Sequence, residues 1–250
     1  MMKRILVTLG LVGCLLTAYA QTEEKIQDVR TYPDYYFLQI DDVASSLNLL
    51  PAPPQPGDIL FMYDQARYYW GKQQRNTPRG DLAVLDADAS AEGVCAALSE
   101  AFGMTLSEQN TPQMFKMIRR ICGDSGDLST REAKNHYMRQ RPYMLFGEST
   151  CLPEDEEELS HNGSYPSGHT AEGWAVALVL AEINTDRQDA ILQRGFDMGT
   201  SRVICGYHWQ SDVDNARIVA AALVARLHAD KGFVAQLAKA KKEFRRLSKK

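Results

Sequence analysis

Apolar residues recur at every third or fourth position along most of the chain beyond residue 58. This spacing predicts amphipathic helices, because about 3.6 residues complete one turn and one face then turns toward a core. Alternation of apolar and polar residues, which would predict strands, is almost absent. The segments with the helical pattern are residues 59–74, 90–103, 111–126, 128–142, 167–184, 186–206, 208–229 and 239–250.

These segments predict an all-α fold, a single-domain helical bundle. No long flexible linker divides the chain, and no internal repeat is present. Residues 31–58 are rich in aromatic residues and prolines, so we expect an extended segment that wraps the bundle and contains a short helix. Ser90 is placed as an N-cap, and Ser129 to Glu132 matches the Ser-x-x-Glu capping box.

Residues 1–20 differ from the rest of the chain. Lys3 and Arg4 precede a short apolar run that ends in Thr-Ala-Tyr-Ala at Ala20. A basic start, an apolar core and small residues at the exit are typical of a secretory signal peptide. The run is too short for a membrane anchor, which needs about 20 apolar residues. We therefore expect a signal peptide over 1–20 and one mature domain over 21–250.

The charge balance excludes some classes of partner. Lys3 and Arg4 leave with the signal peptide, so the 28 basic residues fall to 26 against 32 acidic ones, a net charge of −6. This balance favours neither a nucleic acid nor an anionic membrane. The longest apolar runs of the mature chain, 174–180 and 218–227, are also too short to insert across a bilayer.

The cysteines leave several possibilities open. Cys14 follows Leu-Val-Gly, which resembles a lipoprotein signal, although further apolar residues come after it. In an exported protein the remaining four cysteines can pair in three ways, and free buried thiols fit equally well. The sequence does not choose among these alternatives for Cys95, Cys122, Cys151 and Cys205.

A first polar cluster lies in Arg-Glu-Ala-Lys-Asn-His-Tyr-Met-Arg-Gln-Arg-Pro-Tyr. Lys134 and Arg141 are seven residues apart, two helical turns, so we expect both on one face of a helix that Pro142 ends. Paired cations suit an anion, but exposed charges are also common on ordinary helices.

The second cluster is Gly-Ser-Tyr-Pro-Ser-Gly-His-Thr, residues 163–170. Ser167 is expected to cap the following helix, and Gly168 lets a ligand approach the backbone closely. Amides at a helix N-terminus form an anion site, and His169 would lie in that first turn. The plainer interpretation is a capped helix with a surface histidine.

The third cluster joins Arg202, His208 and Asp212. On a helix, residues four apart are neighbours, so the carboxylate of Asp212 could hold Nδ1 of His208 and leave Nε2 bare. We expect Gly206 to break the helix, so that Arg202 and His208 reach one pocket. Taken alone, this spacing also fits a surface ion pair.

In this order the clusters are similar to the signature of the acid phosphatase and vanadium haloperoxidase superfamily: Lys-x6-Arg-Pro, Pro-Ser-Gly-His and Ser-Arg-x5-His-x3-Asp. The longer stretches NGSYPSGHTAEGWAVALVLAEIN and SRVICGYHWQSDVDNAR resemble the bacterial class A non-specific acid phosphatases, whose relatives include a periplasmic apyrase. The resemblance covers most of the mature chain. Its signature positions are Lys134, Arg141, Pro142, Pro166, Ser167, Gly168, His169, Ser201, Arg202, His208 and Asp212.

The resemblance implies a helical fold of that superfamily and a periplasmic, metal-independent acid phosphatase with broad specificity for phosphate monoesters. It implies no cofactor and a homodimer. His208, oriented by Asp212, would become a phosphohistidine, and His169 would protonate the leaving alcohol. For that, His169 must start protonated, a state that the nearby phosphate would favour, and His208 must start neutral. The implied phosphate-binding residues are Lys134, Arg141, Ser167, Gly168 and Arg202.

Other functions remain open at this point. An apyrase that hydrolyses nucleoside tri- and diphosphates would use the same catalytic residues. A vanadium haloperoxidase would hold vanadate in the same cluster, and orthovanadate would activate it rather than inhibit it. A periplasmic phosphate-binding protein would not turn over any ester. A metal site on His169, His208 and Asp212 would lose its activity in EDTA.

The remaining polar residues fit structural roles. His136, His161 and His228 lie outside the signature, and the acidic run from Glu154 to Glu158 fits a solvated loop. The sequence suggests Tyr165 as one wall of a pocket for the leaving group.

Overall fold

A computed structural model describes residues 35–249, and within this range the secondary structure is helical with no strand, which confirms the all-α prediction. The predicted signal peptide and Cys14 lie outside the described residues. The long helices are α2 (Ile59–Gln74), α3 (Pro78–Leu85), α4 (Ala91–Phe102), α5 (Pro112–Cys122), α9 (Gly168–Ile183), α10 (Gln188–Cys205), α11 (Gln210–Leu227) and α12 (Lys231–Leu247). The short elements are η2 (Ile40–Asp42), α1 (Ser46–Leu49), the π-helical η3 (Gly123–Leu128), α6 (Arg131–Tyr137), α7 (Pro142–Phe146), η4 (Pro153–Asp155), α8 (Glu156–Ser160) and η5 (Thr185–Arg187).

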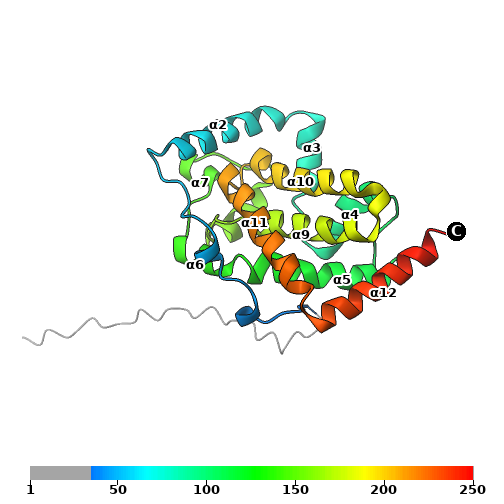
Figure 1. Ribbon diagram of the computed structural model, residues 1–250. Coiled ribbons are helices and arrows are strands. Elements are labelled where there is room, and N and C mark those ends of the chain that lie inside the picture. The colour runs from blue at the N-terminus through cyan, green and yellow to red at the C-terminus, as the bar shows by residue number, and fades with distance from the viewer. Residues whose placement is uncertain (1–34, 250) are drawn as a thin grey trace, which may run out of the picture.

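Helix α9 lies at the centre, with α10 and α11 beside it and α5 packed against it (Figure 1). Its sequence is apolar on almost every face, which is typical of a helix buried on all sides. Glycines let α10 come close: a Cβ added at Gly195 would lie 2.3 Å from the Cβ of Ala177. Because the short η5 joins α9 to α10, the two helices run antiparallel. The first turn of α9 therefore lies beside the last turns of α10.

Helices α2, α3 and α4 pack against α10 (Figure 1). The backbones of α2 and α10 are in contact, since a Cβ added at Gly71 would lie 2.7 Å from the carbonyl oxygen of Val203. Ser90 caps α4 as predicted, accepting a hydrogen bond from the backbone of Gly93 at 3.0 Å. Within residues 35–249, none of the helices combines the length and apolar character needed to cross a bilayer.

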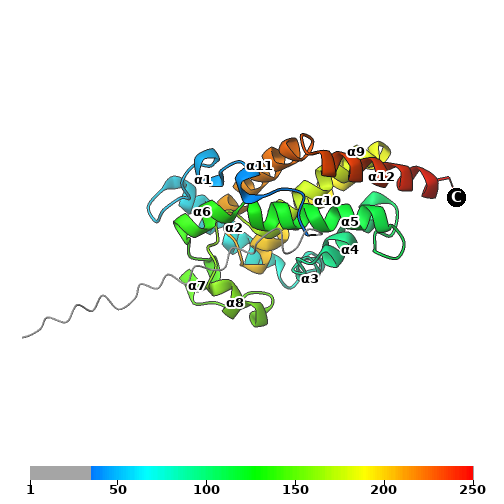
Figure 2. The ribbon, with the colours of Figure 1, turned by 90° about the horizontal axis from the view of Figure 1, so that it is seen from below.

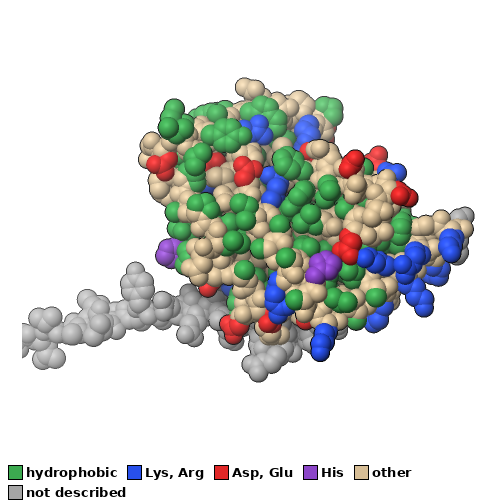
Figure 3. Space-filling model, in the orientation of Figure 1, with side chains coloured by type: hydrophobic (Ala, Val, Ile, Leu, Met, Phe, Trp, Pro, Cys, Tyr) green, Lys and Arg blue, Asp and Glu red, His purple; other side chains and the backbone are tan. Residues whose placement is uncertain are grey.

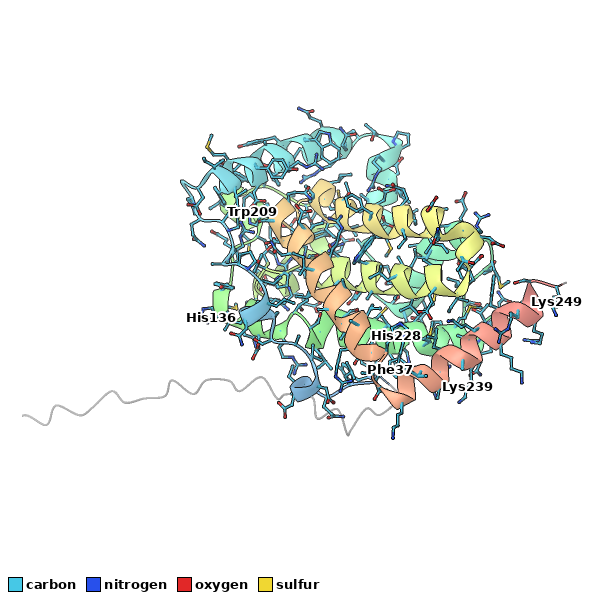
Figure 4. All side chains as sticks on the ribbon, in the orientation of Figure 1. Phe37, His136, Trp209, His228, Lys239 and Lys249 are labelled. Atoms are coloured by element: carbon cyan, nitrogen blue, oxygen red, sulfur yellow. The ribbon has the colours of Figure 1, made fainter. Side chains whose placement is uncertain are left out.

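Residues 35–58 wrap the bundle in an extended path with η2 and α1, as predicted (Figure 2). The buried carboxylate of Asp124 accepts hydrogen bonds from the backbone of Phe37 at 3.1 Å and of Leu38 at 3.3 Å. The ring of Phe37 packs edge-on against Phe233 of α12, with ring centroids 5.4 Å apart (Figure 4). These contacts fasten the segment to both η3 and α12.

The segment 128–142 is not one helix, which corrects the prediction for this cluster. Helix α6 ends at Tyr137, and Met138 has a φ of 39°, in the left-handed region. Pro142 does not end a helix but begins α7. Proline favours an extended conformation in the residue before it, and Arg141 accordingly has a ψ of 155°.

The predicted capping box from Ser129 to Glu132 is also wrong. The π-helical η3 runs almost directly into α6, and no side chain caps the N-terminus of α6. The hydroxyl of Ser129 donates to the carbonyl of Ser125, and that of Thr130 to the carbonyl of Gly126, each at 2.6 Å. Hydroxyls bonded back into the preceding turn do not reach the amides ahead of them.

Helix α12 has an exposed basic face and a buried face. Lysines and arginines gather on the molecular surface toward the C-terminus, where Lys239 and Lys249 lie (Figures 3 and 4). Phe233, Leu237 and Ala240 are buried in the core, where α12 packs against α5. The basic tail is therefore a docked helix with one solvated face.

One carboxylate of α12 caps α5. Glu243 is buried, and its carboxylate accepts hydrogen bonds from the backbone of Gln113 at 3.1 Å and of Met114 at 3.0 Å. The N-cap residue Thr111 makes no side-chain cap of its own. A negative charge at a helix N-terminus also interacts favourably with the helix dipole. Glu243 thus replaces the missing cap and joins the two helices.

We predict that Glu243→Ala lowers the free energy of unfolding by about 2–3 kcal/mol, because two buried amides lose their acceptor. Urea denaturation followed by circular dichroism measures the change. The neighbouring exposed Lys242 provides a control, since Lys242→Ala should change stability by less than about 0.5 kcal/mol. Equal effects of the two substitutions would contradict a capping role.

Candidate active site

The three predicted clusters meet at one end of the central helix. They come from α6 and the loop after it, from the first turn of α9, and from the junction of α10 with α11. Nη1 of Arg141 lies 3.1 Å from Nε2 of His208. Burial, then the charges of Arg141, Lys134 and Arg202, lower the pKa of His208 well below its usual range. The predicted residues that gather here are Lys134, Arg141, Ser167, Gly168, His169, Arg202, His208 and Asp212.

His208 does not lie on a helix, contrary to the prediction from its spacing. Helix α11 begins at Gln210, with Trp209 as its N-cap (Figure 4). Nδ1 of His208 lies 2.9 Å from the backbone oxygen of Ser164 and 3.5 Å from Oδ2 of Asp212. A carbonyl only accepts, so Nδ1 carries the hydrogen and Nε2 of the neutral ring is bare. The Ser164 carbonyl, rather than the Asp212 carboxylate, fixes this tautomer.

Asp212 acts on His208 through Ser164. Its carboxylate is fully buried, and Oδ2 accepts hydrogen bonds from the Ser164 hydroxyl at 2.5 Å and from the Trp209 amide at 2.8 Å. Oδ1 accepts from Arg139 at 2.5 Å. Asp212 therefore holds in place the residue whose carbonyl orients the imidazole.

Arg139 is a charge partner that the signature does not contain. Its guanidinium bridges two buried carboxylates, Asp212 and, at 2.8 Å, Asp64 on α2. Asp64 also accepts hydrogen bonds from the amide of Ser211 at 2.8 Å and from its hydroxyl at 2.6 Å. A buried ion pair is tolerated when its remaining hydrogen-bonding capacity is satisfied in this way. The network anchors the start of α11 to α2.

Lys134 and Arg141 reach the cluster from separate elements rather than from one helix face. Nζ of Lys134 donates to the carbonyl of Gly163 at 2.7 Å, and Arg141 donates to the carbonyls of Leu159 at 2.9 Å and Tyr207 at 3.1 Å. Burial and the charge of Arg141 lower the pKa of Lys134 to about 7. Burial lowers the pKa of Arg141 to about 10. An anion placed between them would reverse both shifts.

Arg202 lies in the last turn of α10, which Gly206 ends with a φ of 84°, as predicted. The guanidinium packs over the ring of Tyr207, 4.2 Å from the ring centroid. Its Nε and Nη1 atoms are buried and have no hydrogen-bond partner. Leaving buried donors unsatisfied is costly, and a guanidinium fork matches the oxygens of a phosphate or carboxylate. Arg202 is therefore positioned for an anion.

The first turn of α9 adds neutral donors. The hydroxyl of Ser167 caps the helix as predicted, accepting from Thr170 Oγ1 at 2.9 Å and from its amide at 3.4 Å. The hydroxyl hydrogen of Ser167 remains free to donate. A side chain at position 168 would be crowded, because a Cβ there would lie 3.0 Å from the carbonyl oxygen of Gly126. Gly168 and His169 are partly exposed, so this end of the helix is open to a ligand.

His169 donates from one nitrogen and keeps the other free. Nε2 lies 3.0 Å from the carbonyl of Ala87, so it carries the hydrogen and Nδ1 is the atom that can exchange a proton. Burial, then Arg202 and His208, lower the pKa of His169 well below its usual range. In the ligand-free protein these surroundings favour the neutral ring. A bound anion would raise that pKa again.

Other predicted features lie away from this cluster or have structural roles. His136 and His161 are exposed, and Figure 4 shows His136 at the edge of the molecule. Nε2 of His228 lies 3.1 Å from Oε2 of Glu182. Tyr165 is fully buried and its hydroxyl donates to a backbone carbonyl at 2.7 Å, so it does not line a pocket. In the described part of the chain, no group of three or more His, Cys, Asp or Glu side chains is arranged to hold a metal ion.

Comparison with known proteins places this arrangement in a family. Residues 121–233 match the model of the PAP2 superfamily. The chain is 55% identical over 222 residues to a non-specific acid phosphatase of Providencia stuartii, covering 89% of this chain and 90% of that protein. It is 42% identical over 203 residues to a non-specific acid phosphatase of Salmonella typhimurium, covering 81% of each. It is 39% identical over 194 residues to an acid phosphatase of Zymomonas mobilis, covering 78% of this chain and 73% of that protein. The chain belongs to the bacterial class A acid phosphatases.

The matched region of this acid phosphatase contains every signature position. Two residues of the site, Ser164 and Arg139, were not predicted from the sequence. Ser164 lies inside the second cluster. Arg139 lies inside the first, between Lys134 and Arg141. Serine and arginine are common in loops, and only their long-range contacts give them a role. For Arg139 that contact is with Asp64, 75 positions away.

Glu172 is a third residue of this phosphatase that the sequence did not suggest. It lies one turn after His169 on α9, over Gly126, where an added Cβ would clash with Glu172 Oε1. Its Oε2 is buried without a hydrogen-bond partner. Burial raises the pKa of Glu172 to about 8, although Arg202 and Lys134 oppose the shift. The carboxyl group is therefore neutral at acid pH.

We predict that Glu172→Gln raises the melting temperature at pH 8–9 by several degrees relative to its effect at pH 5. The folded protein holds the Glu172 proton up to about pH 8, whereas the unfolded chain releases it near the ordinary value of 4.5. Stability due to this group is thus complete below pH 4.5 and is lost as the pH rises toward 8. The amide of the variant has no proton to lose in this range.

Melting curves of the ligand-free wild type and variant, recorded from pH 5 to pH 9, test this prediction. The control is Glu157→Gln on α8, because the side chain of Glu157 is 92% exposed and should show no such pH dependence. A difference between wild type and Glu172→Gln that stays constant across the range would show that the raised pKa does not contribute.

Proposed function

We propose that this chain hydrolyses small-molecule phosphate monoesters with broad specificity, without a metal ion, through a phosphohistidine at His208. One observation carries the proposal: the buried guanidinium of Arg202 has two donor nitrogens without a partner. It lies in the same cluster as His208, whose Nε2 carries no hydrogen. The cation needs an anionic ligand, and the bare nitrogen is a nucleophile for it.

The phosphoryl group would lie among three cations and the N-terminus of α9. Lys134, Arg141 and Arg202 neutralise the charge on its non-bridging oxygens through the transition state. The Ser167 hydroxyl and the Gly168 amide donate further hydrogen bonds. These fixed groups supply the electrostatic stabilisation that a metal ion supplies in other phosphatases.

In the first step Nε2 of His208 attacks phosphorus, the N–P bond forms and the ester P–O bond breaks. Arg141 exchanges its 3.1 Å contact with Nε2 for a phosphoryl oxygen. The hydrogen bond from Nδ1 to the Ser164 carbonyl keeps the ring aligned and stabilises its positive charge. Asp212 contributes negative charge nearby, 3.5 Å from Nδ1.

His169 would manage the protons of both steps. With the substrate dianion bound, its pKa rises and Nδ1 carries a proton, which passes to the leaving alkoxide. The neutral ring then accepts a proton from the water that hydrolyses the N–P bond. An acid pH optimum follows, because His169 must gain a proton while His208 stays neutral.

We propose that the protein acts in the periplasm. The predicted signal peptide over residues 1–20 and the family of this chain support export to the periplasm.

We predict that His208→Ala lowers kcat at least about 10³-fold, because the reaction loses its nucleophile. Phosphate release near pH 6 from p-nitrophenyl phosphate, AMP, ATP and pyrophosphate, in EDTA, measures activity and substrate preference.

Wild type should keep full activity in EDTA and should be inhibited by orthovanadate. An alkaline quench should trap a phosphoenzyme from wild type and none from the variant. A phosphoenzyme from His208→Ala would refute the nucleophile, and lost activity in EDTA would refute metal independence.

We predict that the effect of His169→Ala depends strongly on the leaving group. Hydrolysis of an alkyl phosphate such as glycerol phosphate should fall about 10²–10⁴-fold in kcat/KM, because its alkoxide needs a proton. The kcat/KM for p-nitrophenyl phosphate should fall far less, since p-nitrophenolate leaves without a proton. His136→Ala, at an exposed site on α6, is the control and should change neither. Equal losses on both substrates would disprove the general-acid role.

A further inference from the structure

Two of the cysteines lie side by side next to the candidate active site. The amide of Cys151 donates to the carbonyl of Cys205 at 3.2 Å, and Cys151 packs against the small buried cluster that contains Cys205. Both sulfurs are free thiols. Cys205 is the last residue of α10, in the turn that separates Arg202 from His208. Cys151 belongs to the segment between α7 and α8.

Several contacts hold the two cysteines in this position. Arg75 of α2 donates from Nε to the carbonyl of Ile204 and from Nη1 to the carbonyl of Ser149, each at 2.8 Å. It thus holds the residue before Cys205 and the residue two before Cys151. The hydroxyl of Tyr207 donates to the carbonyl of Leu152 at 3.2 Å. The sulfurs are brought together by contacts that do not require a bond between them.

The segment with Cys151 also supports the site. The carboxylate of Glu156 turns inward and accepts from the amide of Thr150 at 2.6 Å, so the acidic run is only partly a solvated loop. The carbonyl of Leu159 accepts from Nε of Arg141 at 2.9 Å. A covalent link at Cys151 would therefore constrain a segment that holds one of the cations beside His208.

We propose that Cys151 and Cys205 are a disulfide site: an oxidising disulfide reagent joins them and fastens the 148–160 segment to the end of α10. Their contact and the fixed backbone on both sides carry this inference. It does not depend on the proposed mechanism, and export to the periplasm would supply a suitable oxidant.

The reaction proceeds by thiol–disulfide exchange. The hydrogen bond from Cys205, with the charges of Arg75 and Arg202, lowers the pKa of Cys151 to about 7, and Cys151 is partly exposed. Its thiolate attacks one sulfur of the reagent and forms a mixed disulfide, releasing one thiolate. Cys205 then attacks the Cys151 sulfur and releases the second thiol. The protein loses two protons and two electrons, and the reagent is reduced to two thiols.

The other two cysteines provide an internal control. Cys95 on α4 and Cys122 on α5 are both buried, and burial raises the pKa of each. Thiols of this kind are slow to react with a disulfide reagent. We expect them to stay reduced.

Mature protein incubated with oxidised glutathione, unfolded in a thiol-alkylating reagent, digested and analysed by mass spectrometry tests the pairing. We expect alkylated Cys95 and Cys122, and one cross-linked peptide pair that contains Cys151 and Cys205. Four alkylated cysteines, glutathione retained on Cys151, or a bond between any other pair would overturn the proposal.

Thermal melting provides a second readout. The bond closes a loop of about 55 residues, so oxidation should raise the melting temperature by about 5–10 °C, reversibly with dithiothreitol. Cys151→Ser, at a partly exposed position, should abolish this shift while hydrolysing p-nitrophenyl phosphate at 25 °C at close to the wild-type rate. Cys95→Ala/Cys122→Ala should retain the shift. A wild-type shift that survives Cys151→Ser would overturn the proposal.

Discussion

Lys134, Arg141 and Arg202 lie buried around His208, where each loses its water and repels the others. The buried carboxylate of Asp212 attracts Lys134 and Arg141, but it pairs with Arg139, which also binds Asp64. The cationic site therefore keeps its charge for a ligand, and the scaffold must hold it against repulsion. The apolar helix α9, packed on several sides, and the backbone carbonyls that receive the cations' hydrogen bonds supply that rigidity.

The spacing of apolar residues predicted the bounds of α2, α4 and α9 closely. It failed where two residues at helical spacing lie on different elements. Lys134 and Arg141 are seven apart, yet Pro142 starts a new helix and forces an extended residue before it. His208 and Asp212 are four apart, yet the helix begins between them. In both cases the two side chains still lie in the same cluster, because the chain bends at the helix boundary between them.

The candidate site could be predicted from its side-chain chemistry, but not from local sequence alone. The cations, the helix N-terminus and the two histidines were recognisable from their residue types and from the order of the three clusters along the chain. Arg139, Ser164 and Glu172 were not, since each acquires its role from residues distant in sequence. Arg139 contacts Asp64, Ser164 orients a histidine 44 positions later, and Glu172 lies over Gly126. Such roles arise only when the tertiary fold has formed.

The low pKa values of Lys134 and His169 in the ligand-free protein have a consequence for the reaction cycle. Near neutral pH the binding of a phosphate group raises these two pKa values, so Lys134 and His169 take up protons from the buffer and offset part of the charge of the ligand. Departure of inorganic phosphate returns those protons to solution. Product release and deprotonation are then one coupled event, and the heat of phosphate binding depends on the ionisation enthalpy of the buffer.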